Sequence, residues 1–354
     1  MRSVLTIFWN SREHRVRALW RLSGQLVLLV VLILPLQIGV GLLTVILYVA
    51  REGIGSGQLA DPQQGALGPQ LLQQFLVESP VLLALSSLGS LAAIYASVWL
   101  AGRFLDRRPF TEFGLHLSQD WWIDFGFGLF LGGLLMVVVF LVELMAGWIT
   151  VGGILVTRHP DRSFLGAILW PFLIFVTVGF YEELFSRGYQ LQNMAEGMNG
   201  RSLGPRGALV AATLLSSAVF GLLHVFNPHA SFASTFNIFL VGAILLATGR
   251  LLTGELAIPI GVHITWNFFQ GNVFGFPVSG GDFRSATFIS IEQGGPDLWT
   301  GGAFGPEAGL LGLATALLGG LLIAWWVHWR YDRLRLRTDL AQAYQPAVRR
   351  DTTA

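Results

Sequence analysis

The chain has 354 residues, of which 53% are hydrophobic and only 12% are charged. A soluble globular domain carries roughly 25% charged residues, so this composition excludes an ordinary soluble enzyme and a disordered protein. The sequence has no cysteine, and all 22 of its basic residues are arginine. Disulfides, thiolate nucleophiles, cysteine-ligated metals and catalytic lysines are therefore excluded, and a polytopic membrane protein is expected.

Eight apolar stretches are long enough to cross a hydrocarbon core of about 30 Å as helices. They cover residues 24–50, 80–102, 122–147, 165–190, 207–226, 236–253, 256–275 and 308–329. Glycine and proline interrupt the sixth and seventh, and neighbouring helices in a bundle can satisfy such breaks. We predict an all-α, polytopic membrane protein with about eight transmembrane helices and a central four-helix core.

The arginines are distributed unevenly between the two sides of this arrangement. With a cytoplasmic N-terminus, 17 of them fall in inner segments and four in outer segments. Basic residues are enriched in cytoplasmic loops, so both termini are predicted to be cytoplasmic, in a cell membrane. The loops at 51–79 and 276–305 are then extracytoplasmic. Arginine without lysine is typical of a GC-rich genome, which favours a bacterial source.

The same pattern divides the chain into four parts. A basic N-terminal segment is favoured over an amphipathic helix lying on the inner leaflet. The parts are a cytoplasmic or interfacial segment (1–23), the N-terminal transmembrane helices (24–164), a central core (165–275), and an extracytoplasmic loop with the last transmembrane helix and a basic cytoplasmic tail (276–354).

Charged residues inside the predicted spans are concentrated at one place. Glu143, Glu182 and Glu183 are the acidic residues that lie well within a span, because Asp124 stands at the very start of the third span. Arg187 lies within the fourth span, close to two of these carboxylates, and Arg250 stands at the cytoplasmic end of the sixth. A charge at the centre of a membrane helix costs about 2.5–3.5 kcal/mol on the insertion scale. Three charges within six residues therefore indicate a functional or structural requirement.

Helical spacing predicts which of these groups meet. Glu183 and Arg187 are four residues apart and share a helix face, so they can form an ion pair. Glu182 lies about 100° around the helix and can face a different neighbour. In a later span, His263 and Asn267 are also four residues apart and point to one site.

Three short runs carry a resemblance to a known family. Glu182–Arg187 reads Glu-Glu-Leu-Phe-Ser-Arg, Phe220–His224 reads Phe-Gly-Leu-Leu-His, and His263–Asn267 reads His-Ile-Thr-Trp-Asn. Together and in this order they resemble the three motifs of the CAAX-protease and bacteriocin-processing family. These are intramembrane endopeptidases that include the type II CAAX prenyl protease. The resemblance covers residues 165–270, about a third of the chain, and it implies that the central four-helix core at 165–275 is the catalytic core.

The resemblance implies peptide-bond hydrolysis by an activated water. It implies that Glu182 acts as general base and then as acid, and that His224 polarises the water from the other side. His263 and Asn267 would donate to the developing oxyanion, where one good donor contributes about 3–4 kcal/mol. No cofactor is needed in this mechanism.

The other motif residues are expected to support the site. Glu183 and Arg187 would fix the helix and the local field without touching the substrate, and Phe220 is expected to pack. The implied partners are a membrane-associated protein or peptide substrate and the lipid bilayer, with no nucleic acid.

Two alternatives stay open. Zinc hydrolysis is possible, with Glu182, His224 and His263 as ligands and water in the fourth position. The metal-independent mechanism is preferred because no His-Glu-x-x-His run places two histidines one turn apart. A non-proteolytic membrane scaffold, in which the polar cluster only holds helices together, is the hypothesis from another class.

Overall fold

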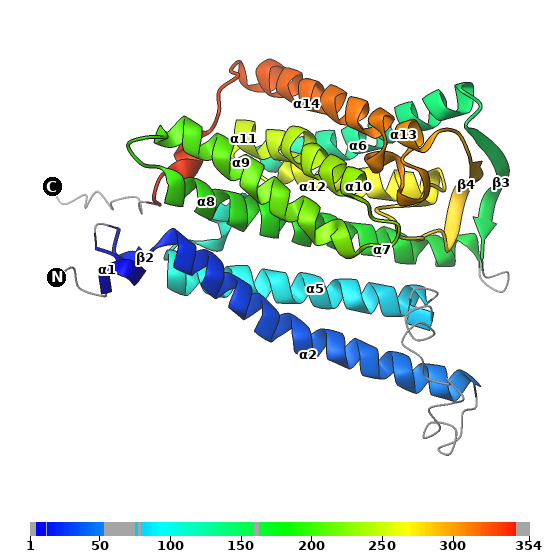
Figure 1. The fold of residues 1–354 in the computed structure, drawn as a ribbon, viewed down its shortest axis with the longest axis horizontal. Helices are drawn as coiled ribbons and strands as arrows, with labels where there is room; N and C mark the ends of the chain where they lie inside the picture. Colours follow the sequence, from blue (N-terminus) through cyan, green and yellow to red (C-terminus); the bar gives the residue numbers. More distant parts are fainter. Residues whose placement is uncertain (1–4, 12, 53–74, 77–78, 159–162, 345–354) are drawn as a thin grey trace.

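The computed structural model describes residues 5–11, 13–52, 75–76, 79–158 and 163–344. The predicted extracytoplasmic loop at 51–79 therefore lies mostly outside the described residues. Within them the chain forms a helical bundle (Figure 1). The first and last described segments lie at one end of the bundle, and the two strands β3 and β4 lie at the opposite end.

Seven helical segments in the described part of the chain are long and apolar enough to cross a membrane, which confirms the all-α membrane fold. Each matches a predicted span to within a few residues, apart from extensions at the end of the bundle that carries the described chain ends. They are Ala18–Arg51, Pro80–Asp106, Gln119–Met145, Phe164–Met198, Gly204–Phe226, Phe232–Thr253 and Leu310–Tyr331.

Several of these segments change helix type partway along. The α-helices are α2 (Ala18–Glu52), α5 (Pro80–Ala101), α6 (Gln119–Met145), α7 (Phe164–Glu183), α8 (Leu191–Met198), α9 (Gly204–Leu223), α10 (Phe232–Val241), α11 (Ala247–Thr253), α12 (Ala257–Phe268) and α14 (Leu310–Tyr331). π-helical turns follow α5, α7, α10 and α12; they are η1 (Gly102–Asp106), η3 (Leu184–Gln190), η5 (Gly242–Leu246) and η6 (Phe269–Val273). Turns of this kind are frequent at functional sites.

The eighth predicted span, 256–275, is a shorter element than expected. Helix α12 has 12 residues and η6 adds five, so the segment does not qualify as a span by length. It is buried in the middle of the bundle between α6 and α7. A β-carbon on Gly261 would lie 2.5 Å from the Phe125 carbonyl oxygen of α6, and one on Gly179 of α7 would lie 2.6 Å from the Ile264 side chain. These glycines let both neighbours approach α12 closely.

The helices are arranged in layers around α12. Residues from α6, α10, α12 and α14 form the largest apolar core, which includes Leu135, Ile238, Ile258 and Ile323. On the other side, α7 packs on α5, and α5 packs on α2. Helix α2 therefore lies at the edge of the bundle, and it exposes most of its apolar side chains.

The end of the bundle opposite the described chain ends contains a two-stranded sheet that the sequence analysis did not predict. Strand β3 (Ile149–Thr157) pairs antiparallel with β4 (Ala286–Gln293), with Ile149 opposite Gln293 and Thr157 opposite Ala286. The short helices α13 (Asp297–Thr300), η7 (Gly302–Phe304) and η8 (Pro306–Ala308) connect β4 to α14. The sheet brings the loop after α6 to the loop that follows α12.

The start of the chain does not form a long amphipathic helix within its described residues. A four-residue helix, α1 (Leu5–Phe8), is followed by the strands β1 (Trp9–Asn10) and β2 (Arg15–Val16), which pair with each other. Arg15 and Arg21 are buried here and both form ion pairs with Glu196 of α8. Within the described residues, this basic segment is therefore held to the bundle by ion pairs.

Candidate active site

The first motif lies where α7 changes into the π-helical turn η3. Glu182 and Glu183 are the last two residues of α7, and Arg187 lies inside η3. Glu183 and Arg187 are fully buried, whereas 23% of the Glu182 side chain is exposed. The two adjacent carboxylates thus face different surroundings, as their 100° separation predicts.

Glu183 connects the first motif to the third. One of its oxygens, Oε1, lies 2.9 Å from Arg187 Nη1 and 2.8 Å from His263 Nδ1. A carboxylate paired with a guanidinium is an acceptor, so this geometry places a proton on Nδ1 of His263. Sequence analysis gave Glu183 only the ion pair with Arg187; the structure adds the orientation of the imidazole ring.

Glu182 approaches the opposite nitrogen of the same ring. Its Oε2 lies 3.6 Å from Nε2 of His263. This separation is longer than a hydrogen bond but short enough for electrostatic contact or for one bridging water. His263 therefore lies between two carboxylates, one buried and paired with arginine and one at the edge of a cavity.

The second motif orients His224 through the main chain. His224 begins the 3₁₀ turn η4 (His224–Phe226) after α9, and its Nδ1 lies 2.8 Å from the Phe220 carbonyl oxygen. A carbonyl oxygen only accepts, so Nδ1 donates the hydrogen. In the neutral ring the lone pair is then on Nε2, the nitrogen that the backbone contact leaves free.

Phe220 packs among the charged and aromatic groups. Its ring centroid lies 4.2 Å from the guanidinium carbon of Arg187, 4.8 Å from the His224 ring and 6.2 Å from the His263 ring. A buried cation over an aromatic face is stabilised by the ring quadrupole. Phe220 thus packs against the buried arginine and both imidazole rings.

A cleft of about 490 Å³ contains all four residues predicted to be catalytic. Its lining includes Glu182, His224, His263 and Asn267. The side chain of Asn267 makes no hydrogen bond to any described residue, so its amide is available to a ligand. One wall is apolar, and it is formed by Leu83, Phe175, Val178 and Tyr181.

A buried carboxylate that the sequence analysis missed lies next to this cleft. Glu307 of η8 lines a small adjoining cavity of about 40 Å³ together with His224, His263 and Asn267. Its oxygens accept hydrogen bonds from the Ser279 backbone and hydroxyl and from the Gln270 amide. Burial raises the pKa of Glu307 to about 7. Its position before an apolar helix gave no periodic signal that would have marked it.

Glu307 holds a turn that covers part of the cleft. Ser279 and Gly280 both have positive φ, +48° and +78°. A β-carbon on Gly280 would overlap the Pro228 carbonyl oxygen, so only glycine fits. Asn227 donates to the Ser279 carbonyl oxygen at 2.9 Å from the other side.

The donor chemistry of the site suits a metal only in part. Both imidazoles donate from Nδ1 to an oxygen and have Nε2 directed away from that contact, which is the arrangement that zinc-ligating histidines adopt. Within the described residues, however, no group of three His, Asp or Glu side chains is arranged to hold a metal ion. We therefore derive no catalytic step through a metal.

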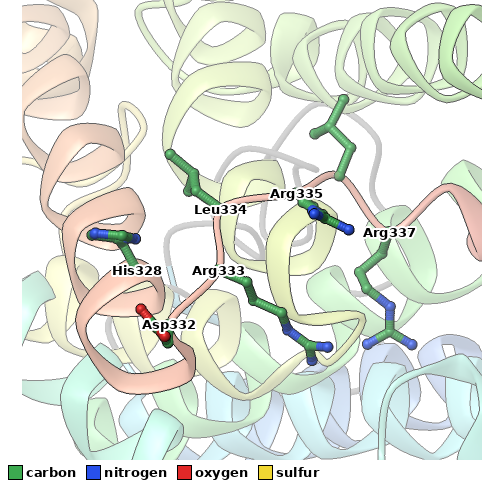
Figure 2. A pocket seen from close by; sticks show the side chains of 7 residues that line it. His328, Asp332, Arg333, Leu334, Arg335 and Arg337 are labelled. Carbon is green, nitrogen blue, oxygen red and sulfur yellow. The ribbon is translucent and has the colours of Figure 1, made fainter.

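A second hollow of similar size lies at the other end of the molecule. It has a volume of about 550 Å³ and is formed by the end of α14 and the segment that follows it (Figure 2). The residues that line it are mostly basic or apolar; they are His328, Asp332, Arg333, Leu334, Arg335, Leu336 and Arg337. None of them belongs to a predicted motif.

The fold and the site together define a multi-pass membrane protein with a polar, partly buried cleft in its helical core. Residues 164–269 match the family described as "Type II CAAX prenyl endopeptidase Rce1-like". The resemblance predicted from the three motifs is therefore confirmed for this segment, and it supports a peptidase.

A more distant similarity covers a longer part of the chain. Over 184 residues the sequence is 28% identical to the uncharacterized protein YyaK of Bacillus subtilis (strain 168). This similarity covers 49% of the chain, which spans about half (54%) of the length of that curated relative. No solved structure matches the chain significantly.

Proposed function

We propose that this protein is an intramembrane endopeptidase that hydrolyses a peptide bond of a membrane-associated protein or peptide. The observation that carries the proposal is the contact between Glu182 Oε2 and His263 Nε2, 3.6 Å apart, in a cleft that also includes His224 and Asn267. The match of residues 164–269 to the Rce1-like endopeptidases supports the same reaction class.

In the proposed mechanism a water molecule lies between Glu182 and His224. Glu182 accepts one proton of the water, and Nε2 of His224 accepts a hydrogen bond from the other. The oxygen attacks the carbonyl carbon and forms a tetrahedral intermediate. Glu182 then delivers its proton to the amide nitrogen and the C–N bond breaks. The new carboxyl group gives up the second water proton to the released amine, so the products are a carboxylate and an ammonium group.

The oxyanion is assigned to His263 and Asn267. Asn267 donates from its unpaired side-chain amide. His263 already donates from Nδ1 to Glu183, so it donates from Nε2 only when the ring carries a proton on both nitrogens. Glu183 is then a positioning residue that fixes the ring plane and balances the imidazolium charge.

The metal-independent mechanism is distinguished from a zinc mechanism by metal analysis of the purified protein. We expect cleavage to survive chelation and dialysis, with substoichiometric zinc. Stoichiometric zinc whose removal abolishes cleavage would replace the proposed mechanism with one in which Glu182, His224 and His263 are ligands and bound water is the nucleophile.

The proposed activity is tested by comparing new protein termini in membranes that contain the wild type or the Glu182→Gln variant. We expect a set of termini that requires Glu182. Arg333→Gln, at the opposite end of the molecule, is the matched control and should preserve the set. Glu182→Ala, His224→Ala and His263→Ala are assayed for folding in parallel. If all three unfold and no wild-type turnover is found, the polar cluster is a structural scaffold.

A further inference from the structure

The catalytic cleft opens toward one end of the bundle. Besides the helical residues, its lining includes two loop segments, Asn227–His229 and Val278–Phe283. The second segment leads directly into β4, so both lie at the end that carries the strands, opposite the described chain ends (Figure 1). The hydrolytic groups are therefore reached from the strand end.

A second hollow continues from the mouth of the cleft across this end. It has a volume of about 580 Å³, and four residues line both hollows: His229, Gly280, Gly281 and Asp282. The outer hollow runs along the last residues of β4, which include Glu292, and reaches Asp297 at the start of α13. A peptide in an extended conformation can lie in both hollows at once, because they share this wall.

Charge identifies the side of the membrane on which this end lies. The strand end carries only Arg51, Arg158 and Arg284 among the described arginines, and two of these pair with Asp282. The opposite end carries the arginines of the N-terminal segment, of the loops after α5 and α8, and of the segment after α14. By the rule that cytoplasmic loops are rich in arginine, the strand end is extracytoplasmic.

The linings of the two hollows differ in polarity. The cleft has the apolar wall of Leu83, Phe175 and Val178 next to the catalytic groups. In the outer hollow, Asp282 is neutralised by Arg158 and Arg284, whereas Glu292 and Asp297 form no ion pair within the described part of the chain. The outer hollow therefore has an excess of negative charge, which favours a basic ligand.

We propose that the cleft receives its substrate from the extracytoplasmic side. The substrate is a peptide segment at that membrane surface, with apolar residues beside the scissile bond and a basic flank in the outer hollow. This assignment rests on the proposed peptidase function. It excludes cytoplasmic C-terminal peptides as substrates, because they meet the opposite end of the bundle.

The chain contains no cysteine, so single cysteines report accessibility without background. His229→Cys places a thiol at the wall that the two hollows share, and Arg335→Cys places one in the hollow at the opposite end. Both side chains are exposed and make no hydrogen bond to a described residue. The cysteine-free wild type is the unlabelled control.

We expect a membrane-impermeant maleimide to label His229→Cys in intact cells. Arg335→Cys should react only after the membrane is permeabilised. The reverse pattern would overturn the proposed opening. Since labelling needs no catalysis, the same result is expected in a Glu182→Gln background.

The substrate class is tested by the positions of the Glu182-dependent termini. We expect them in extracytoplasmic segments, with arginine or lysine enriched on one flank. Glu182-dependent termini in cytoplasmic segments would refute the substrate assignment and leave hydrolysis intact. Correct labelling without any Glu182-dependent terminus would uphold the opening and refute the peptidase function instead.

Discussion

The two ends of the molecule each carry a hollow of about 500 Å³, but their polar groups are held differently. In the catalytic cleft, His263 is 7% exposed and is fixed by a fully buried carboxylate, and His224 is fixed by a backbone carbonyl. In the hollow after α14, Arg333 and Arg335 are exposed and extend from an irregular segment (Figure 2). Volume alone does not distinguish the two.

The difference shows what marks a chemical site in this fold. Polar groups in the core are costly unless they have partners, so a buried cluster with fixed orientations is preorganised for chemistry. Exposed arginines at a membrane surface are expected from topology alone. Substitutions at the strand end should therefore change reaction rates, whereas the same kind of substitution at the opposite end should not.

The largest effect is expected for Glu182→Gln. Loss of the general base should reduce the cleavage rate at least about 10³-fold, because the amide cannot accept a proton from water. The side chain lies at the edge of a cavity, so thermal unfolding should change little. The rate is measured on a substrate identified from the new termini. A variant that retains more than a tenth of the wild-type rate would remove Glu182 from the mechanism.

Glu183→Gln should affect stability as well as rate. It leaves the fully buried Arg187 without its counter-ion, which typically costs 3–5 kcal/mol. The double variant Glu183→Gln, Arg187→Met removes both charges and should recover much of the stability but not the rate, because the carboxylate that balances the imidazolium charge of His263 is still missing. Thermal unfolding and single-turnover cleavage measure the two quantities. Recovery of full activity in the double variant would show that Glu183 does not position His263.

Asn267→Ala separates rate from stability more cleanly. Its amide is unpaired, so removal should leave the unfolding temperature nearly unchanged. Loss of one oxyanion donor should lower kcat about 10²- to 10³-fold with little change in KM. A rise in KM of the same size, with kcat unchanged, would instead indicate that Asn267 binds the substrate in the ground state.

The raised pKa of Glu307 predicts that the stability of the strand end depends on pH. Its pKa is raised to about 7 in the folded protein, against 4.5 ordinarily, so between these values the folded state holds a proton that the unfolded chain has released. The free energy of unfolding should therefore fall as the pH rises from about 4.5 to 7, by up to about 3 kcal/mol. Unfolding scans of the wild type and of Glu307→Gln measure this slope. An equally steep fall in the variant would assign it to another group.

The smallest effects are expected in the hollow after α14. Arg333→Gln and Arg335→Gln remove exposed charges that form no ion pair within the described residues. Stability should change by less than about 0.5 kcal/mol and the cleavage rate by less than twofold. A loss of rate comparable to that of Asn267→Ala would mean that the two ends are coupled and that the contrast between them is wrong.

Much of the fold was predictable because a bilayer imposes long apolar runs. Seven of the eight predicted spans are present in the described residues. The eighth was overestimated, because a 17-residue segment that is buried on every side has the same apolar composition as one that faces lipid. The sheet of β3 and β4 was missed, because its strands lie far apart in sequence within segments that were read as loops.

Helical spacing alone predicts a contact in the site only where one helix carries both groups, whereas the resemblance named the four residues that line the cleft. Spacing gave the Glu183–Arg187 pair, which is present at 2.9 Å. It gave no way to see that Glu183 also reaches His263, 80 residues away, because that contact depends on how α7 and α12 pack at Gly179. Glu307 was missed for the same reason, since only the folding of the loop after β4 brings it to the cleft.

The most direct test of hydrolysis at this cleft is the source of the oxygen in the product. Membranes are incubated in water enriched in ¹⁸O, and the new C-terminal carboxylates are analysed by mass spectrometry. We expect each Glu182-dependent product to carry ¹⁸O from the attacking water, and no such product with Glu182→Gln. Products that form equally with Glu182→Gln, or that carry no ¹⁸O, would contradict a Glu182-activated water as the nucleophile.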